Sequence, residues 1–314
     1  MAKNEVPEVD IIVDEQAGVI REVKPQPKLR SKRGHERRVN GAIYTVLVVM
    51  SIIWLVPFVF LILQSFRSYL TESGGMVDYL LPKAFSLDNY RWLLFDEKSN
   101  FLRWYLNTLI IALFCSALQT LMVLSVSYTL SRLRFKGRRL IMNVVLVLGM
   151  FPGFLTMITL YFLLKQLGLT QSGAIPGLIL IYVASSGMGY YISKGFFDTI
   201  PRSIDEAAII DGATQWQVFT RITLPLSKPI VIYTVMTAFI APWVDFIFAK
   251  VLCRANADQF TVAIGLWNML QKEYIYQWYT CFAAGAVLIS IPIAILFLYM
   301  QRFYVEGMSG AVKG

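Results

Sequence analysis

The stretch SIDEAAIIDGATQWQVFTRITLPL, residues 203–226, is a polar segment in a chain that is otherwise apolar. It carries the acidic residues Asp205, Glu206 and Asp211, and it is interrupted by Gly212 and Pro225. Apolar segments long enough to cross a membrane flank it on both sides. The side of the membrane on which this segment lies, and the surface that it contacts, are therefore the first questions that the sequence raises.

The composition of the chain is typical of an integral membrane protein. Of its 314 residues, 56% are hydrophobic and 16% are charged, whereas about a quarter of the residues are charged in a typical soluble domain. The net charge of +9 comes from basic residues beside apolar segments, which is typical of topology signals and not of nucleic-acid binding. The three cysteines and the single histidine show no metal-ligand spacing, and we expect no metal, cofactor or catalytic residue.

Six apolar stretches have roughly the 20 residues that a helix needs to cross a bilayer. They are Ala42–Leu63, Asn107–Leu130, Leu140–Leu164, Ile175–Ile192, Pro229–Leu252 and Cys281–Met300. Basic residues precede the first stretch and follow the second, which places both of these flanks in the cytoplasm. We therefore predict an all-α protein with six transmembrane helices, and with both termini and the polar segment in the cytoplasm.

The first half of the polar segment predicts a short capped helix. Ser203 and Glu206 have the spacing of a capping box, in which each side chain accepts a hydrogen bond from the backbone N–H of the other residue. This pattern predicts a helix over Ile204–Asp211. Gly212 then suits the left-handed conformation that often follows the last residue of a helix.

The second half predicts another short helix. Thr214 and Gln217 form a second capping box, which predicts a helix over Gln215–Ile222 that ends before Pro225. Two helices of this length are not stable alone in water, so they need a surface on which to dock. A helix on an anionic membrane surface carries basic residues on its polar face. The acidic residues of the first helix therefore favour a protein partner over the lipid surface.

The spacing of the segment resembles the EAA motif of ATP-binding-cassette (ABC) import permeases. Glu206-Ala207-Ala208 is followed after three residues by Gly212, after nine more by Ile222, and then by Leu224-Pro225. In that family this loop is a coupling helix that lies in a cleft of the ATPase subunit. The resemblance implies ATPase-coupling roles for Asp205, Glu206, Ala207, Ala208, Asp211, Gly212, Ile222, Leu224 and Pro225. Glu206 has two open roles, contact with the ATPase or capping of its own helix.

Other stretches are similar to the carbohydrate-uptake branch of this family. They include FSLDNYRWLL at 85–94 and YTLSRLRFKGRR at 128–139, and the C-terminal EGMSGAVKG resembles the smaller permease of maltose/maltodextrin importers. The resemblance implies an ABC importer type I permease fold over residues 39–314. Within it we expect a coupling loop at 194–228, an external loop at 253–279 and a cytoplasmic tail at 303–314. Residues 1–38, outside the resemblance, read as a disordered basic cytoplasmic tail.

The resemblance also implies partners and a substrate. The partners are a second, larger permease subunit, two ATPase subunits and an extracellular sugar-binding protein. The complex would lie in the bacterial cytoplasmic membrane and form a path for oligosaccharides, with maltodextrin as the expected sugar. The chain has no G-x-x-x-x-G-K-[ST] phosphate loop. A partner subunit would therefore bind and hydrolyse the ATP.

Three further sites follow from the resemblance and from the position of a carboxylate. The tail would reach the interface between the ATPases through Gly307, Ser309, Gly310, Val312 and Gly314. The external loop would enter the sugar cleft of the binding protein. Beside Trp243, Asp245 lies within a predicted span, where a carboxylate is costly and faces either a cavity or a partner. It could therefore contact the sugar path or bond to a neighbouring helix, and we favour the structural bond.

The competing class is an ion-coupled secondary carrier, or another membrane protein without an ATPase partner. A secondary carrier would show an inverted repeat and broken helices at the membrane midplane. The sequence shows no such repeat. The coupling loop is therefore the feature that separates the two classes.

Overall fold

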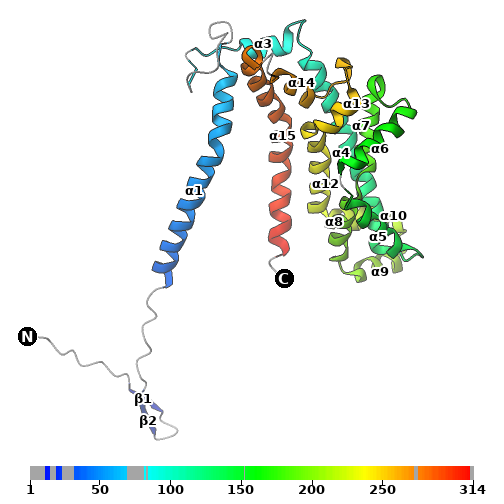
Figure 1. Cartoon of the computed structure of the whole chain (residues 1–314). Coiled ribbons are helices and arrows are strands. Elements are labelled where there is room, and N and C mark those ends of the chain that lie inside the picture. The colour runs from blue at the N-terminus through cyan, green and yellow to red at the C-terminus, as the bar shows by residue number, and fades with distance from the viewer. Residues whose placement is uncertain are drawn as a thin grey trace, which may run out of the picture. The chain divides into compact units, whose positions relative to one another are not determined.

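The computed structural model describes residues 11–14, 19–22, 32–68, 81–82, 84–151, 153–271 and 275–311 (Figure 1). The chain divides into two compact units, Met1–Phe58 and Val59–Gly314. In the first unit, β1 (Ile11–Asp14) and β2 (Val19–Glu22) pair as antiparallel strands. They contain Ile and Val, which favour strands, but the sequence analysis predicted no strand here. The predicted disorder of the remaining tail stays a prediction.

The long helix α1 (Lys32–Ser65) contains the first predicted span. Its apolar part, Val39–Ser65, reaches a mean hydropathy of 3.0 over a window in which no residue is buried. A helix that is apolar all round needs apolar surroundings on every side. A bilayer supplies such surroundings, so this part of α1 is a membrane-spanning helix.

Four helical stretches of the described residues are long and apolar enough to cross a membrane. They are Val39–Ser65, Phe101–Arg132, Gln171–Asp198 and Trp278–Gln301. A fifth is formed if Gln215–Leu226 and Lys228–Val244 count as one span, although they are bent by 85° relative to each other. The chain is therefore a helical multi-pass membrane protein. The predicted six transmembrane helices are not confirmed by this criterion.

The third predicted span is not one helix. In place of Leu140–Leu164 the structure has α5 (Arg138–Gly149) and α6 (Gly153–Gln166). The sequence at the break contains Gly149, Pro152 and Gly153, and glycine and proline are the residues that stabilise a helix least. Hydropathy alone does not register this break, because both halves are apolar.

The fifth predicted span, Pro229–Leu252, is also divided. α12 (Lys228–Val244) ends at Asp245, and α13 (Ile247–Cys253) begins two residues later. The Oδ1 atom of Asp245 accepts a hydrogen bond of 3.1 Å from the N–H of Phe248 in the first turn of α13. The carboxylate thus provides an acceptor for a backbone donor that the start of a helix leaves without an intrahelical partner.

Besides α4, the described residues of the second unit form seven further elements outside the polar segment. They are α3 (Asp88–Phe95), η1 (Gln171–Gly173), α7 (Ala174–Ala184), α8 (Gly187–Asp198), η3 (Ala257–Gln259), α14 (Val262–Met269) and α15 (Ile275–Ala311).

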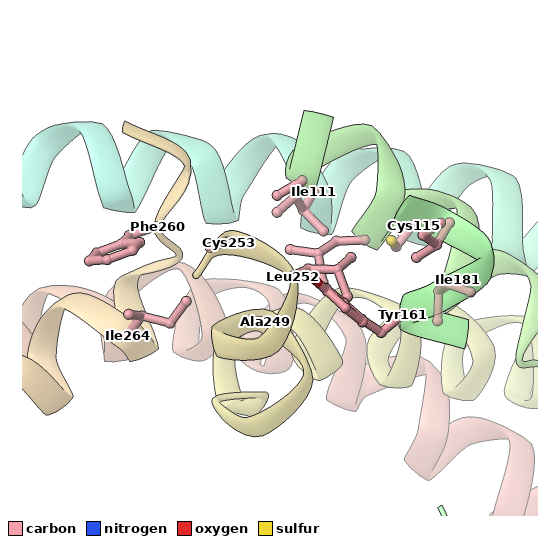
Figure 2. Packing of buried hydrophobic residues seen from close by; sticks show 12 residues of the cluster. Ile111, Cys115, Tyr161, Ile181, Ala249, Leu252, Cys253, Phe260 and Ile264 are labelled. Carbon is pink, nitrogen blue, oxygen red and sulfur yellow. The ribbon is translucent and has the colours of Figure 1, made fainter. Parts of the chain in front are cut away.

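The helix α4 (Phe101–Arg132) organises the second unit, where it packs against α7, α8, α12 and α14. One buried cluster joins it to α6, α7 and α13. Figure 2 shows Ile111 and Cys115 of α4 in this cluster, with Leu252 of α13 and Ile181 of α7. The apolar side chains of α4 thus pack against residues from three other helices. These contacts hold α4 in place within the bundle.

The two ends of α4 form hydrogen bonds with different parts of the chain, namely the loop after α13 and the last residue of α8. Near its start, the Nδ2 atom of Asn107 donates to the carbonyl oxygens of Asp258 at 2.8 Å and Phe260 at 3.0 Å. Near its end, the hydroxyl of Ser131 donates to Oδ1 of Asp198 at 2.6 Å. The helix between Asn107 and Ser131 is about 36 Å long at about 1.5 Å per residue, more than the roughly 30 Å hydrocarbon thickness of a bilayer. The loop after α13 and the polar segment therefore lie at opposite ends of the unit (Figure 1).

Candidate functional site

The first helix of the polar segment, α9 (Arg202–Ile210), ends at a glycine. Gly212 has φ +88°, its N–H donates to the carbonyl of Ile209 at 3.0 Å, and the N–H of Ala213 donates to that of Ala208 at 2.9 Å. This pair of bonds is the Schellman motif, in which glycine takes the left-handed position. The prediction that Gly212 ends this helix in a left-handed conformation is confirmed, whereas its coupling role stays a prediction.

The start of α9 differs from the prediction. The helix begins at Arg202, with Pro201 as the N-cap residue and no side-chain capping bond. Ser203 already lies within the first turn, so its hydroxyl is not at the capping position, and the predicted capping box with Glu206 is wrong. Glu206 is exposed and forms no hydrogen bond or ion pair with any residue that the structure describes. The helix itself therefore does not use the Glu206 carboxylate.

The second predicted capping box is confirmed. The N–H of Gln217 donates to Oγ1 of Thr214 at 3.3 Å, and the N–H of Thr214 donates to Oε1 of Gln217 at 2.8 Å. Both sides of the turn between the two helices are thus fixed by hydrogen bonds. We refer to this hydrogen-bonded turn as the rigid corner.

The second helix is longer than predicted. α10 (Gln215–Gln217) continues as the π-helical η2 (Val218–Thr223) and as α11 (Leu224–Leu226), and the chain then bends by 85° into α12. Pro225 lies within α11, the last three residues of this continuous helical stretch. The prediction that Pro225 ends the helix is therefore wrong, and the bend follows it at Ser227.

A buried ion pair connects α4 to α9. The Nε atom of Arg132 lies 2.9 Å from Oδ2 of Asp205, and the two side chains are only 5% and 11% exposed. Arg132 also donates through Nη2 to the carbonyl of Ile200 at 3.0 Å, and Arg202 donates to the carbonyl of Ser131 at 3.2 Å. We refer to Ser131, Arg132, Arg202 and Asp205 as the α4–α9 contact.

The end of α8 joins the same contact. Asp198 accepts a hydrogen bond from Ser131 at 2.6 Å and forms an ion pair with Lys194 one turn earlier in α8. The last turns of α4 and α8 are thus held together beside the start of α9. A displacement of α9 would therefore act directly on both membrane-spanning stretches.

An apolar cluster supports the second helix from inside. The ring of Tyr128 in α4 lies 4.8 Å from that of Phe219, and its hydroxyl donates to Oε1 of Gln215 at 3.2 Å. Leu124, Phe197 and Ile230 also belong to the cluster. The half-buried motif residue Leu224 packs against it, and Ile222 is half-buried.

The opposite side of the segment is exposed and partly apolar. Ile210 is 85% exposed and Trp216 is 64% exposed, beside the exposed acidic residues Glu206 and Asp211. Ala207 is exposed as well. We call these five residues the outward face. The predicted coupling residues thus separate into two groups, because Asp205 lies inside while the outward face is open to a partner.

Comparisons with known proteins identify the family. Residues 122–310 match the model of the family described as "Binding-protein-dependent transport system inner membrane component". The chain belongs to this family. It is a membrane component of a transport system that depends on a binding protein, and not an ion-coupled carrier.

Curated relatives of this permease cover most of its length. It is 36% identical over 274 residues to the galactooligosaccharides transport system permease protein of Bacillus subtilis (strain 168), covering 86% of this chain and 94% of that one. It is 35% identical over 273 residues to the maltodextrin transport system permease protein of the same organism, covering 86% and 95%. The maltodextrin transport system permease protein of Streptococcus pneumoniae is 33% identical over 284 residues, covering 89% and 98%.

Solved structures share the fold of the permease. A chain of a bacterial ABC transporter that imports the acidic polysaccharide alginate has a TM-score of 0.70 at 23% identity, covering 89% of the permease and 100% of that chain. A chain of the same kind of transporter, in complex with a periplasmic protein that holds an alginate pentasaccharide, has a TM-score of 0.63 at 18% identity, covering 86% and 97%. At this identity the comparison shows the fold alone.

The remaining predicted residues of the permease have mixed surroundings. Trp243 is buried in α12, with its ring 5.3 Å from that of Tyr105. The Oδ2 atom of Asp245 accepts a hydrogen bond from the hydroxyl of Tyr182 in α7. Together with the bond to Phe248, this gives Asp245 the structural partners that the sequence analysis favoured. Its contact with a sugar path stays a prediction.

The predicted C-terminal tail is helical as far as the structure describes it. α15 continues to Ala311 and includes Gly307, Ser309 and Gly310, while Val312 and Gly314 lie outside the described residues. Their predicted contact with ATPase subunits stays a prediction.

Sequence reasoning missed the partners of the coupling segment inside the permease. In the sequence, Arg132 is one of the basic residues that follow the second apolar stretch, and Tyr128 only begins the stretch YTLSRLRFKGRR. Nothing in the spacing of the basic run distinguishes Arg132 from the others.

Proposed function

We propose that this permease is one of two membrane subunits of an ATP-driven importer of oligosaccharides in a bacterial cytoplasmic membrane. It would form half of the translocation path and would bind no ATP itself. The observation that carries this proposal is the outward face, whose exposed residues lie on both sides of the rigid corner between α9 and α10. The close relatives of the permease, which are named as sugar transport permeases, support the substrate class.

The outward face is suited to a protein partner with an apolar cleft. Burial of apolar surface contributes about 25 cal/mol per Å², and Ile210 and Trp216 leave most of their side chains available for it. Glu206 and Asp211 add negative charge beside these side chains. An ATPase subunit with a cleft that is apolar inside and basic at its edge would fit the outward face.

The coupling path would run through the α4–α9 contact. In this mechanism, ATP binding closes a pair of ATPase subunits and moves α9 with them. Because Asp205 is bound to Arg132 within the permease, α4 would follow, and the bent connection at Ser227 would transmit the same motion to α12. The sugar path would open outward, and ATP hydrolysis would return it to the inward state.

Six membrane crossings fit the structure if broken helices are counted as single crossings. α5 contacts α8, whereas α6 contacts α13, which lies at the other end of the unit (Figure 1). We therefore propose that α5 and α6 cross the membrane together, and that α12 and α13 do the same. Both termini and the polar segment would then be cytoplasmic, and the loop with α14 would be extracellular and available to a sugar-binding protein.

Maltodextrin and galactooligosaccharides are the substrate candidates. The relative named for galactooligosaccharides is 36% identical to this chain, and the relative named for maltodextrin is 35% identical. These identities are too similar to favour one sugar over the other. We propose a neutral oligosaccharide and retain maltodextrin as the first choice, since the C-terminal sequence resembles that branch. The larger permease subunit would supply most of the sugar contacts.

The direct test is reconstitution. The permease would be co-expressed with a second permease and an ATPase subunit from the same organism, purified and placed in proteoliposomes with the cognate binding protein. ATP-dependent uptake of labelled maltodextrin or galactooligosaccharide is expected. Failure of any ATPase to co-purify with the permease would contradict the proposal.

A further inference from the structure

A basic hollow of about 350 Å³ lies where α4 is followed by α5, outside the coupling site described above. It is lined by Arg134, Phe135, Gly137, Arg138, Arg139 and Leu140. Gly137, with φ +92°, is the N-cap residue of α5, and its left-handed conformation turns the chain so that arginines before and after it border the same space.

The guanidinium groups of this hollow have little to neutralise them. Arg134 and Arg139 form no ion pair or hydrogen bond with any residue in the described part of the chain. Arg138 interacts electrostatically with Asp198, but that carboxylate is already bonded to Ser131 and Lys194. Three cations around one concave site attract an anion, and the planar guanidinium group matches phosphate oxygens in a bidentate arrangement.

The surroundings of the hollow are apolar on the side of α5. Leu140 is 67% exposed and Phe135 is 40% exposed at the hollow itself. Farther along α5, Val147 and Leu148 are 55% and 61% exposed, and no residue of α5 is buried. An exposed apolar helix face therefore begins at the arginines and continues away from them.

This arrangement matches a phospholipid more closely than a free anion. The hollow follows the last residue of α4, which is long and apolar enough to cross a membrane, and basic residues that flank such a helix lie near the headgroups. We propose that the hollow binds the phosphate of an anionic phospholipid, with the acyl chains along the exposed apolar face of α5. A basic hollow beside membrane-spanning helices is the type of site that recognises anionic headgroups. A topology signal alone would need the positive charges but not this concave arrangement.

The site is tested by lipid binding to the full-length permease in detergent. The probes are palmitoyl-oleoyl phosphatidylglycerol and the zwitterionic phosphatidylcholine with the same chains, and bound lipid is counted by native mass spectrometry. The permease is expected to retain phosphatidylglycerol in preference to phosphatidylcholine. Equal retention of the two lipids would overturn the proposal.

Variants localise the binding. Arg138→Gln leaves the other basic residues of the loop in place for correct topology, and it is expected to weaken phosphatidylglycerol binding by about fivefold, the equivalent of about 1 kcal/mol per basic residue. The triple variant Arg134→Gln/Arg138→Gln/Arg139→Gln is expected to abolish the preference. The matched control Arg91→Gln/Lys98→Gln/Lys165→Gln removes the same charge from exposed positions elsewhere and is expected to bind like the unmodified permease. An equal loss in the control and in the triple variant would show nonspecific attraction and overturn the site.

Two further measurements separate the lipid from other anions. Millimolar inorganic phosphate is expected to leave the bound phosphatidylglycerol in place, because the acyl chains contribute to its binding; complete displacement would indicate a simple anion site. If the triple variant keeps phosphatidylglycerol but loses its ATPase partner, the hollow is a protein contact and the lipid proposal is wrong.

Discussion

The guanidinium of Arg132, at the end of α4, and the carboxylate of Asp205, in α9, form a buried ion pair with a separation of 2.9 Å. Asp205 therefore belongs to the inside of the permease although its neighbour Glu206 belongs to the outside. One short helix thus presents an acidic residue to each side. We therefore propose separate roles for the two residues, transmission for Asp205 and docking for Glu206.

Loss of the Arg132–Asp205 pair should both destabilise and uncouple the permease. Asp205→Asn leaves the Arg132 charge without its counter-charge, and removal of one partner of a buried pair costs about 3–5 kcal/mol. We expect a lower thermal unfolding temperature and loss of ATP-driven uptake, measured in the reconstituted complex. The exchange Arg132→Asp/Asp205→Arg should restore part of both properties.

The exposed pair between Arg103 and Asp258 is the control for that prediction. These side chains are 57% and 61% exposed, so Arg103→Gln should change the free energy of unfolding by no more than about 1 kcal/mol. If Asp205→Asn were as mild as this control in both assays, the α4–α9 contact would not carry the coupling.

Glu206→Gln should leave the stability of the permease unchanged, within about 0.5 kcal/mol, because Glu206 does not cap α9. It should lower the ATPase activity that the loaded binding protein stimulates, since the outward face loses a charge. Thermal unfolding and ATP hydrolysis are measured on the same preparation. A destabilised variant with normal stimulated hydrolysis would restore the capping role.

Gly212→Val should abolish uptake while the protein remains in the membrane. At φ +88° a β-branched side chain is strained, although a Cβ atom there would meet no neighbour within 4 Å. The strain would displace α10 from α9 and disturb the corner of the outward face. Gly195→Ala is the matched control, because its Cβ is also free and its φ is ordinary; normal transport by Gly212→Val would contradict the rigid corner.

Deletion of Gly307–Gly314 should reduce the ATPase activity that the binding protein stimulates in the assembled importer. The reason is the proposed contact of this tail with the ATPase subunits. The basal hydrolysis of the complex and the amount of co-purified ATPase serve as internal references. Unchanged stimulation would show that these residues only end α15.

Local sequence signals predicted the polar segment unevenly. Gly212 and the Thr214–Gln217 box were predictable, because each depends on backbone conformation and on a side chain within three residues. The box at Ser203 failed because Pro201 takes the capping position and moves the start of α9. A capping pattern therefore predicted the helix start correctly only where no other residue nearby could take the capping position.

Long-range partners were not predictable in the same way. Hydropathy gave the apolar stretches but not the breaks at Asp245 and between α5 and α6, because apolar composition is the same on both sides of a break. The partner of Asp205 depends on where α9 packs against α4, and the partner of Asp245 is Tyr182, far away in the sequence. Such pairs are set by tertiary packing, which a single sequence does not display.

Protection of position 207 tests the central claim most directly, namely that the outward face docks on an ATPase. The three natural cysteines are buried, and Ala207 is exposed, so the thiol of Ala207→Cys is the one expected to react with a water-soluble maleimide. We predict fast labelling in the isolated permease and strong protection in the importer with its ATPase subunits. Equal labelling rates in the two preparations would contradict the account.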